Sequence, residues 1–376
     1  MMAGIYFHIP FCKQACHYCD FHFSTSLTYR AEMLAAMEKE IALQAHYLND
    51  RAIESIYFGG GTPSLLEADE VSRLIDAVVG HFDIQSDAEI TLEANPDDLN
   101  NVKVAAMRNT PVNRFSIGIQ SFFEEDLCWM NRAHNAVEAL EAIQRVQDSG
   151  YGNITADLIY GYPLLTDRKW LQNIGRLLDF GVPHISAYCM TVEPQTALAS
   201  FIRRGKQTPI DDGQGATQFE LLMDELAAAG YEQYEISNFA KPEQYARHNS
   251  NYWKGVPYLG IGPSAHSFDG HSRQWNVRNN AKYIRAIQNG VVPHEREELS
   301  EADRLNEYIM TALRTQWGLN LDYIDAQFRA SYSGVVRAGL ESLVIRGEVT
   351  LVGKVATLTK KGKLVADRVA AELFVD

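Results

Sequence analysis

The chain has 376 residues, of which 46% are hydrophobic and 22% are charged, a composition typical of globular proteins large enough for one large and one smaller domain. Its 34 basic and 48 acidic residues give a net charge of −14, which argues against broad nucleic-acid binding. No apolar run approaches the roughly 20 residues of a membrane helix, and the N-terminus does not resemble a signal peptide. We therefore expect a soluble cytoplasmic protein with no integral membrane segment and no nucleic-acid partner.

Strand and helix patterns alternate over the first 230 residues. The predicted strands are Gly4–Phe11, Ser55–Phe58, Glu89–Ala94, Arg114–Gln120, Ile154–Tyr160 and His184–Met190. The predicted helices are Leu27–Leu48, Ala68–Val79, Leu99–Met107, Val137–Ser149, Trp170–Phe180 and Gln214–Ala229. Six strand–helix units predict a parallel sheet with right-handed crossovers, and because eight units would close a barrel, six predict a partial (β/α)6 TIM-like barrel.

Along the rest of the chain, the composition changes near residue 240 and the order of predicted elements changes near residue 300. Residues 231–239 are predicted to form one more strand, which ends a barrel domain at residues 1–239. Residues 240–299 are rich in Gly, Asn, His and aromatic residues, and we expect irregular structure laid over the barrel. Residues 300–376 have the order helix, two shorter helices, strand pair around Gly353, and last helix, which suggests a small winged-helix-like domain. Residues 300–376 contain ten Lys/Arg and ten Asp/Glu, so the segment has no net charge and lacks the basic surface of a DNA-binding domain. A lid or packing role is therefore expected.

Three cysteines, Cys12, Cys16 and Cys19, lie on the loop that leaves the first predicted strand. Iron–sulfur clusters are held by closely spaced thiolates of this kind. Since the run supplies three thiolates, a four-iron cluster would keep one iron open to a small-molecule ligand. The other two cysteines, Cys128 and Cys189, are isolated in apolar surroundings.

Two other interpretations of the cysteine run are weaker. A disulfide is disfavoured because the number is odd and no secretory signal precedes it. Zinc with His8, His17 or His22 as fourth ligand is the stronger rival, but structural zinc sites usually pair such a run with a second, distant pair.

Further polar residues follow the other predicted strands. The carboxyl ends of parallel strands meet at one edge, so the cysteines, the Gly59–Gly61 run, Glu93 and Gln120 are expected to converge there. Asp157 falls inside a strand and would have to point into the barrel. The glycine run lacks the phosphate-loop pattern, and by itself it indicates either a tight turn or a close approach of backbone to a ligand.

The cysteine run, preceded by Tyr6-x-His8-Ile9-Pro10-Phe11, resembles that of the radical S-adenosylmethionine (SAM) superfamily, and within it the anaerobic coproporphyrinogen III oxidase-like group. The resemblance extends over nearly the whole chain. It implies a [4Fe-4S] cluster on Cys12, Cys16 and Cys19, with SAM as second cofactor. The positions that match SAM-contacting residues of the family are Tyr6, Gly60, Gly61, Thr62, Glu93, Gln120, Arg132 and Asp157. In the family, the glycine motif contacts the amino end of the SAM methionine, and the Glu93 position contacts ribose hydroxyls.

One more motif lies in the connecting region, at His248-Asn249-Ser250-Asn251-Tyr252-Trp253. If this segment is helical, His248 and Tyr252 share a face, and both residue types bind haem iron in proteins. Arg247 and Lys254 would then be available to the propionates. The alternative is a packed, hydrogen-bonded histidine. The pattern His-Asn-x-x-Tyr-Trp resembles that of HemW-type haem chaperones, which implies that His248 binds haem.

The resemblance leaves two functions open. One is a haem chaperone that passes haem to an unidentified acceptor protein; the other is an oxygen-independent coproporphyrinogen III oxidase that uses SAM cleavage to decarboxylate propionates. The oxidases carry a fourth cysteine two positions after the third, where this chain has Phe21, and an N-terminal extension that this chain lacks. Both differences, together with the His248 motif, favour the chaperone. The SAM-contacting positions are nevertheless present, so SAM cleavage stays an open possibility.

Overall fold

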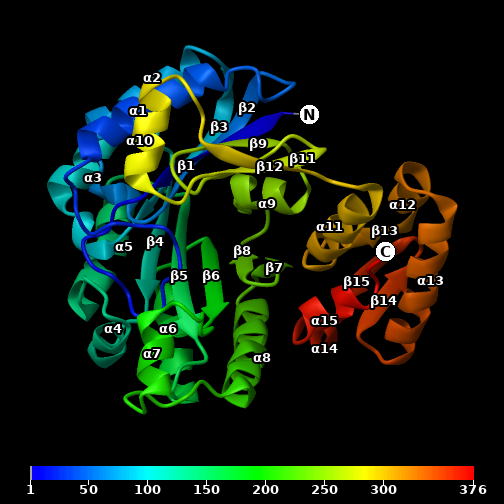
Figure 1. Cartoon of the computed structure of the whole chain (residues 1–376). Coiled ribbons are helices and arrows are strands. Elements are labelled where there is room, and N and C mark those ends of the chain that lie inside the picture. Colours follow the sequence, from blue (N-terminus) through cyan, green and yellow to red (C-terminus); the bar gives the residue numbers. More distant parts are fainter. Residues whose placement is uncertain (1) are drawn as a thin grey trace.

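The computed structural model describes residues 2–376, and its centre is one long sheet (Figure 1). Six parallel strands lie side by side in chain order: β1 (Ala3–Ile9), β2 (Ala52–Gly60), β3 (Asp83–Ala94), β4 (Arg114–Gln120), β5 (Ile154–Tyr160) and β6 (His184–Cys189). The helices between them are α1 (Arg30–Leu43), α2 (Ala68–Val79), α3 (Asn101–Met107), α4 (Glu124–Met130), α5 (Ala136–Asp148) and α6 (Asp167–Asp179), and α7 (Ala197–Arg203) and α8 (Asp212–Ala228) follow β6. The sheet stays open, and the fold is the predicted α/β partial barrel. None of the described helices is long and apolar enough to cross a membrane.

The central strands form where their sequences predict them, because each has an apolar face that packs in the core, such as Phe115, Ile117 and Ile119 of β4. The β4 and β5 bounds match the predicted strands residue for residue. Inside the core, Phe7 of β1 stacks on Phe58 of β2 with ring centroids 4.7 Å apart. Helix α2 begins at a capping box formed by Glu67 and Glu70, and its bounds also match the prediction.

The single strand predicted over residues 231–239 is wrong. The segment forms two antiparallel strands, β7 (Glu232–Glu235) and β8 (Asn238–Ala240), and β8 pairs antiparallel with β6. The Glu235 carboxylate accepts hydrogen bonds from the Ser237 amide (3.0 Å) and the Asn238 side chain (2.7 Å), so it closes the turn between them.

The prediction of irregular structure over residues 240–299 is also wrong. The segment contains α9 (Arg247–Trp253), β9 (Tyr258–Ile261), β10 (His266–Phe268), β11 (Ser272–Asn276), α10 (Asn280–Gln288) and β12 (His294–Glu298). Strand β9 pairs parallel to β1, and the antiparallel strands β10 to β12 continue the sheet to its edge. Strands this short carry little periodicity of their own. The pairing with β1 depends on tertiary contacts.

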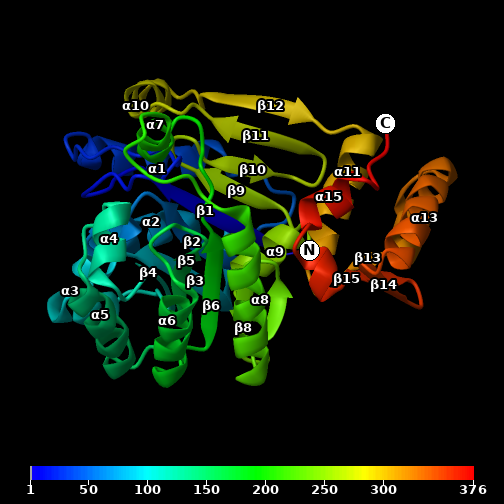
Figure 2. The same cartoon turned by 90° about the horizontal axis from the view of Figure 1, so that it is seen from below.

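Residues 301–371 form a second, smaller body beside the barrel (Figures 1 and 2). Its elements are α11 (Glu301–Leu313), β13 (Leu319–Asn320), α12 (Leu321–Gln327), α13 (Ala330–Ile345), β14 (Val349–Val352), β15 (Val355–Leu358), α14 (Lys360–Lys363) and α15 (Ala366–Ala371). Three helices precede the β14–β15 hairpin, as a winged-helix-like domain requires. The prediction that the second and third helices are short fails for α13, which has 16 residues.

The small body has a hydrophobic core of its own, from Leu305 to Val375, and polar contacts join it to the barrel. Arg314 pairs with the buried Glu235 at 3.3 Å, and Arg273 pairs with Glu307 at 2.6 Å. Both ion pairs are partly shielded from water, and they join the small body to β7 and to β11, which lie toward opposite ends of the sheet.

Candidate functional site

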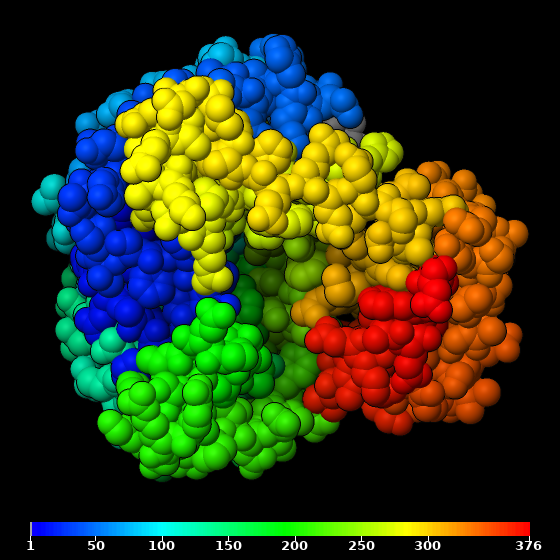
Figure 3. All heavy atoms as spheres, viewed as in Figure 1, coloured from blue at the N-terminus to red at the C-terminus, as the bar shows by residue number. Residues whose placement is uncertain are grey.

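The cysteine loop is closed at its base, where β1 ends. The Cys12 amide donates to the Ser24 carbonyl at 3.0 Å, and the Ser24 amide donates back to the Pro10 carbonyl at 2.9 Å. The loop's middle is fixed at His17, whose amide donates to the Met130 carbonyl at 3.0 Å. The loop therefore lies on the carboxyl ends of the strands, as predicted. In the space-filling view this face is hollowed between the N-terminal segment in blue, residues near 290 in yellow and the C-terminal elements in red (Figure 3).

The three thiols are reduced, and they interact electrostatically with one another. Burial raises the pKa of Cys12 to about 11, against a hydrogen bond from Thr62, and burial also raises the pKa of Cys19 to about 11. Without a metal, both are therefore neutral thiols at pH 7. No group of three or more His, Cys, Asp or Glu side chains within residues 2–376 is already gathered tightly enough to hold a metal ion.

Arg132 lies against this loop. Its guanidinium is 3.5 Å from the Cys16 Sγ and donates to the Asn95 Oδ1 at 2.7 Å and to the Gly118 carbonyl at 2.9 Å. Residue Asn131 just before it has a left-handed φ of 58°, which ends α4 and turns Arg132 inward. The structure thus brings Arg132 together with the cysteines, and it adds Asn95, which the sequence analysis missed although it follows Glu93 by two residues.

The three histidines considered as zinc ligands are occupied elsewhere. His8 Nε2 lies 2.8 Å from the His22 carbonyl, His22 Nε2 lies 2.7 Å from the Asn280 Oδ1, and His17 Nδ1 lies 2.9 Å from the Trp129 carbonyl. Burial lowers the pKa of His8 to about 4, so the ring is neutral. These contacts disfavour a zinc site with a histidine as fourth ligand.

The glycine run packs against the end of β1. The Gly61 amide donates to the Ile9 carbonyl at 2.8 Å, and the Thr62 amide donates to the Phe11 carbonyl at 2.6 Å. A Cβ on Gly60, whose φ is 105°, would lie 2.7 Å from the His8 ring, and a Cβ on Gly61 would lie 2.6 Å from the Phe11 carbonyl oxygen. The chain itself therefore requires glycine here, and the turn holds Thr62 beside Cys12.

Aromatic and acidic side chains line the inside of the barrel. Tyr6 stacks on Tyr57 with centroids 6.2 Å apart, and the Tyr57 hydroxyl donates to the Glu93 Oε1 at 2.7 Å. Burial raises the pKa of Glu93 to about 7, against the Tyr57 hydrogen bond and with a further contribution from the charge of Asp157. Tyr57 was missed by the sequence analysis, although it lies two residues before Gly59 on the same face of β2.

Asp157 lies inside β5, and its side chain points into the barrel, as predicted. The Ser116 hydroxyl of β4 lies 3.4 Å from its Oδ2, and Ser186 of β6 also donates to it. Burial raises the pKa of Asp157 to about 6, although the nearby Arg114 opposes the shift. Glu93 and Asp157 are therefore two interacting carboxyl groups inside one polar interior.

Gln120, the last residue of β4, has an unusual backbone conformation and an unpaired side-chain oxygen. Its φ is 64°, a left-handed value that few residues other than glycine adopt, and its Oε1 is buried with no hydrogen-bond partner among residues 2–376. The Nε of the neighbouring Arg132 is also buried, and it too lacks a partner in the described part of the chain. The two side chains meet at Gly118, where a Cβ would be 3.0 Å from the Gln120 Nε2 and 3.1 Å from the Arg132 Nη2. Unsatisfied buried polar atoms are rare, so this pair suits a polar ligand.

The His248 motif lies at the opposite end of the barrel. Helix α9 covers the amino ends of the strands, and the His248 Nδ1 lies 2.9 Å from the Ser55 Oγ near the start of β2. The imidazole stacks on Tyr57 at 5.0 Å, and burial lowers its pKa to about 3. His248 and Tyr252 share a face of α9, as predicted, and both line a cavity of about 10 Å³.

The structure does not bring Arg247 and Lys254 beside His248, and their contact with the same ligand stays a prediction. Both lie on another face of α9, where they line a separate cavity. Arg247 pairs with Asp87 at 3.2 Å, and the Lys254 ammonium lies 4.0 Å from the centroid of the Trp317 ring.

Comparisons with known proteins agree with this geometry. The sequence model of the radical SAM superfamily matches residues 6–181, which include the cysteine loop, Glu93, Gln120, Arg132 and Asp157. Among solved structures, the Escherichia coli coproporphyrinogen III oxidase HemN, a radical SAM enzyme, is similar with a TM-score of 0.85 and 22% identity, covering 100% of this chain and 90% of that one. The chain thus shares the fold of this enzyme, and residues 6–181 match the radical SAM superfamily.

Relatives define the family within that class. Proteins named "Heme chaperone HemW" are 34% identical in Mycobacterium tuberculosis, 32% in Bacillus subtilis and 32% in Escherichia coli. These matches cover 98–99% of this chain and 94–98% of the relatives. The chain belongs to the HemW family of radical SAM proteins.

Proposed function

We propose that this protein is a haem chaperone, which binds haem and passes it to an acceptor protein, and that it carries a [4Fe-4S] cluster and SAM at the mouth of the barrel. The observation that supports the proposal is the match, over nearly the whole chain, to relatives named as haem chaperones. The coproporphyrinogen oxidase likeness is one of fold alone.

The residues at the mouth suit the two proposed cofactors. Cys12, Cys16 and Cys19 would hold the cluster, because a cationic metal centre favours thiolates over the neutral thiols that burial otherwise imposes. When bound, such a cluster supplies the electron with which radical SAM proteins cleave SAM.

The proposed SAM contacts are Tyr6, Gly60, Gly61, Thr62, Glu93, Gln120, Arg132 and Asp157. Two of them supply the buried polar atoms that lack a partner, the Gln120 Oε1 and the Arg132 Nε. The tyrosine stack of Tyr6 on Tyr57 would hold Glu93 in place, and the burial that raises the Glu93 pKa would exclude water from the same space.

Haem does not fit beside His248 in this conformation. The ring is neutral, the form that binds iron, and its Nε2 has no hydrogen-bond partner among the described residues. However, a cavity of about 10 Å³ holds about one water molecule and no porphyrin. The predicted role of His248 as haem ligand therefore demands that α9 leave the floor of the barrel.

Haem titration of the full chain tests both parts of this proposal. We expect wild type to bind haem with a defined absorbance change, and His248→Ala to bind at least about tenfold more weakly, since it loses the proposed iron ligand. His271→Ala is the matched control, because His271 is exposed and remote from α9. Equal binding by wild type and His248→Ala would make His248 structural; no binding by wild type would refute the chaperone proposal.

A second experiment separates the chaperone from the oxidase. The protein, reconstituted with iron and sulfide, reduced and supplied with SAM and coproporphyrinogen III under anaerobic conditions, is expected to yield no decarboxylated porphyrinogen by mass spectrometry. Formation of that product by a sample with an intact cluster would assign the oxidase activity instead.

A further inference from the structure

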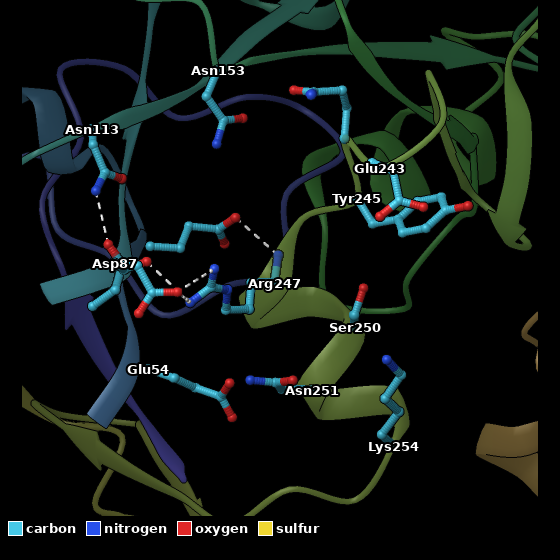
Figure 4. Close-up of a pocket in the computed structure, with 13 residues that line it drawn as sticks. Glu54, Asp87, Asn113, Asn153, Glu243, Tyr245, Arg247, Ser250, Asn251 and Lys254 are labelled. Atoms are coloured by element: carbon cyan, nitrogen blue, oxygen red, sulfur yellow. Dashed lines mark hydrogen bonds and ion pairs between the residues drawn. The ribbon is translucent and has the colours of Figure 1, made fainter. Parts of the chain in front are cut away.

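A second cavity, of about 510 Å³, lies on the outer side of α9 (Figure 4). It is at the amino ends of the strands, far along the barrel from the cysteines. The lining comes from β2, β3, the residues before β4 and β5, the turn before α9, and α9 itself: Glu54, Asp87, Ala88, Glu89, Asn113, Asn153, Glu243, Gln244, Tyr245, Arg247, Ser250, Asn251 and Lys254. Its volume is within the range of about 300–1,000 Å³ that small-molecule sites occupy.

Two polar groups of α9 in this lining have no hydrogen-bond partner among the residues that the structure describes, 2–376. Ser250 is 5% exposed, and its Oγ is one of them. Figure 4 shows the hydroxyl pointing into the open space. The Nδ2 of Asn251 is also buried without an acceptor. Because leaving such groups unpaired costs free energy, they indicate that a polar molecule fills this space.

The charges of the lining are only partly balanced. Asp87 is paired with Arg247, while Glu89 accepts the backbone amides of Arg247 and His248 and faces Arg114 at 3.7 Å. Among residues 2–376, no lysine or arginine pairs with Glu54, which is half-buried, or with Glu243, which is exposed. Glu243 is moreover held with a φ of 65°.

Lys254 on the rim is the remaining charged group, and its ammonium lies over the Trp317 ring. The lining thus holds four carboxylates, those of Glu54, Asp87, Glu89 and Glu243, against the two cations of Arg247 and Lys254. The cavity therefore favours a ligand with a positive charge, and the unpaired amide of Asn251 adds the need for a hydrogen-bond acceptor.

We propose that this cavity is a binding site for a small molecule that combines a primary ammonium group with an amide or carboxylate acceptor, in the class of lysine derivatives. The ammonium would pair with Glu54 and Glu243. The acceptor would receive hydrogen bonds from Asn251 and Ser250. The site is separate from the barrel mouth, but Asn251 also lines the small cavity beside His248, so the test is made without haem, with α9 at the floor of the barrel.

Calorimetric titration of the full chain with N-acetyl-L-lysine amide tests the proposal. N-acetyl-L-norleucine amide, which has a similar shape but no ammonium, is the control probe. We expect the lysine probe to bind and the norleucine probe to bind at least about tenfold more weakly, because charged hydrogen bonds to Glu54 and Glu243 are lost.

Variants localise the site. Glu54→Gln is expected to weaken binding of the lysine probe about tenfold, and Ser250→Ala about threefold. Glu243→Gln is a second carboxylate variant in case Glu54→Gln does not fold. Glu220→Gln is the matched control, since it removes one exposed carboxylate from α8, away from the lining. It should bind as wild type.

Three results would overturn the proposal. One is the absence of binding at millimolar probe concentration. Another is equal binding of the two probes. The third is equal weakening by Glu54→Gln and Glu220→Gln, which would show that only the net charge of −14 attracts the probe.

Discussion

Strand β3 carries two glutamates, Glu89 near the floor of the barrel and Glu93 near its mouth, four residues apart on one face. Glu89 accepts two backbone amides of α9, at 2.9 and 3.0 Å, and faces the guanidinium of Arg114. Glu93 receives one side-chain hydrogen bond, from Tyr57, and its pKa is raised to about 7.

The difference teaches how the two ends of the barrel are used. At the floor, the chain itself satisfies the buried charges, and α9 seals the strands. At the mouth, carboxyl groups are left with few partners, and buried polar atoms of Gln120 and Arg132 have none. Unpaired buried atoms mark places suited to a ligand, at the mouth and also at Ser250 and Asn251 on the outer side of α9, whereas the paired charges of Glu89 and Arg114 stabilise the fold.

The largest effect is expected on the amount of bound iron, when a cysteine at the mouth is replaced. Cys16→Ser should lower the iron bound after anaerobic reconstitution at least about tenfold, because a serine hydroxyl does not replace a thiolate in a cluster. Iron and sulfide analysis measures this. Cys128→Ser is the control, since Cys128 is exposed on α4. Full iron content in Cys16→Ser would show that the mouth is no metal centre, and the contrast between the two ends would fail.

The next largest effect is expected on the free energy of unfolding, when a buried charge at the floor is removed. Arg114 is 1% exposed, so Arg114→Met leaves the Glu89 carboxylate buried without its cation and should lower the free energy of unfolding by about 3–5 kcal/mol. Urea denaturation measures it. Arg247→Met removes the more exposed pair with Asp87 and should cost about 0–1 kcal/mol. Similar losses in both variants would mean that the floor is not held by its buried pair.

The smallest effect is a pH dependence from Glu93. Its pKa rises from 4.5 in the unfolded chain to about 7 in the folded protein, so the folded state binds the proton more tightly. Stability should therefore fall as pH rises from about 4.5 to about 7, by an amount on the order of 1–3 kcal/mol. Asp157, raised from 3.8 to about 6, adds a loss in the lower part of that window.

Glu93→Gln tests this sign. Its urea midpoint should fall less than that of wild type between pH 5 and pH 8, because glutamine does not ionise. Glu220→Gln should follow wild type. If all three proteins show the same slope, the mouth does not hold a protonated Glu93 at low pH.

The barrel strands were predictable because each is a short, apolar, locally readable run. The β4 and β5 bounds, the α2 bounds and the placement of the cysteines after β1 follow from the residues in those segments. The position of Asp157 inside β5 was enough to predict that it points inward.

Other features have no local signal. The four residues of β9 become a strand because β1 lies beside them, and Gly260 allows this since a Cβ would lie 2.1 Å from the His266 carbonyl oxygen. The partners of Gln120 and Arg132 were also hidden, because Gly118, Asn95 and Cys16 come from three separate segments.

By itself, the sequence determined the parallel barrel, the cysteine loop at the carboxyl ends of its strands and the helical face shared by His248 and Tyr252, because all three depend on periodicity and spacing along the chain. Only the tertiary structure decided that α9 lies at the floor, that His248 is sealed against Ser55 and that a separate cavity opens on the other side of α9. The physical reason is that burial and hydrogen-bond partners are properties of packed neighbours, which come from distant parts of the chain.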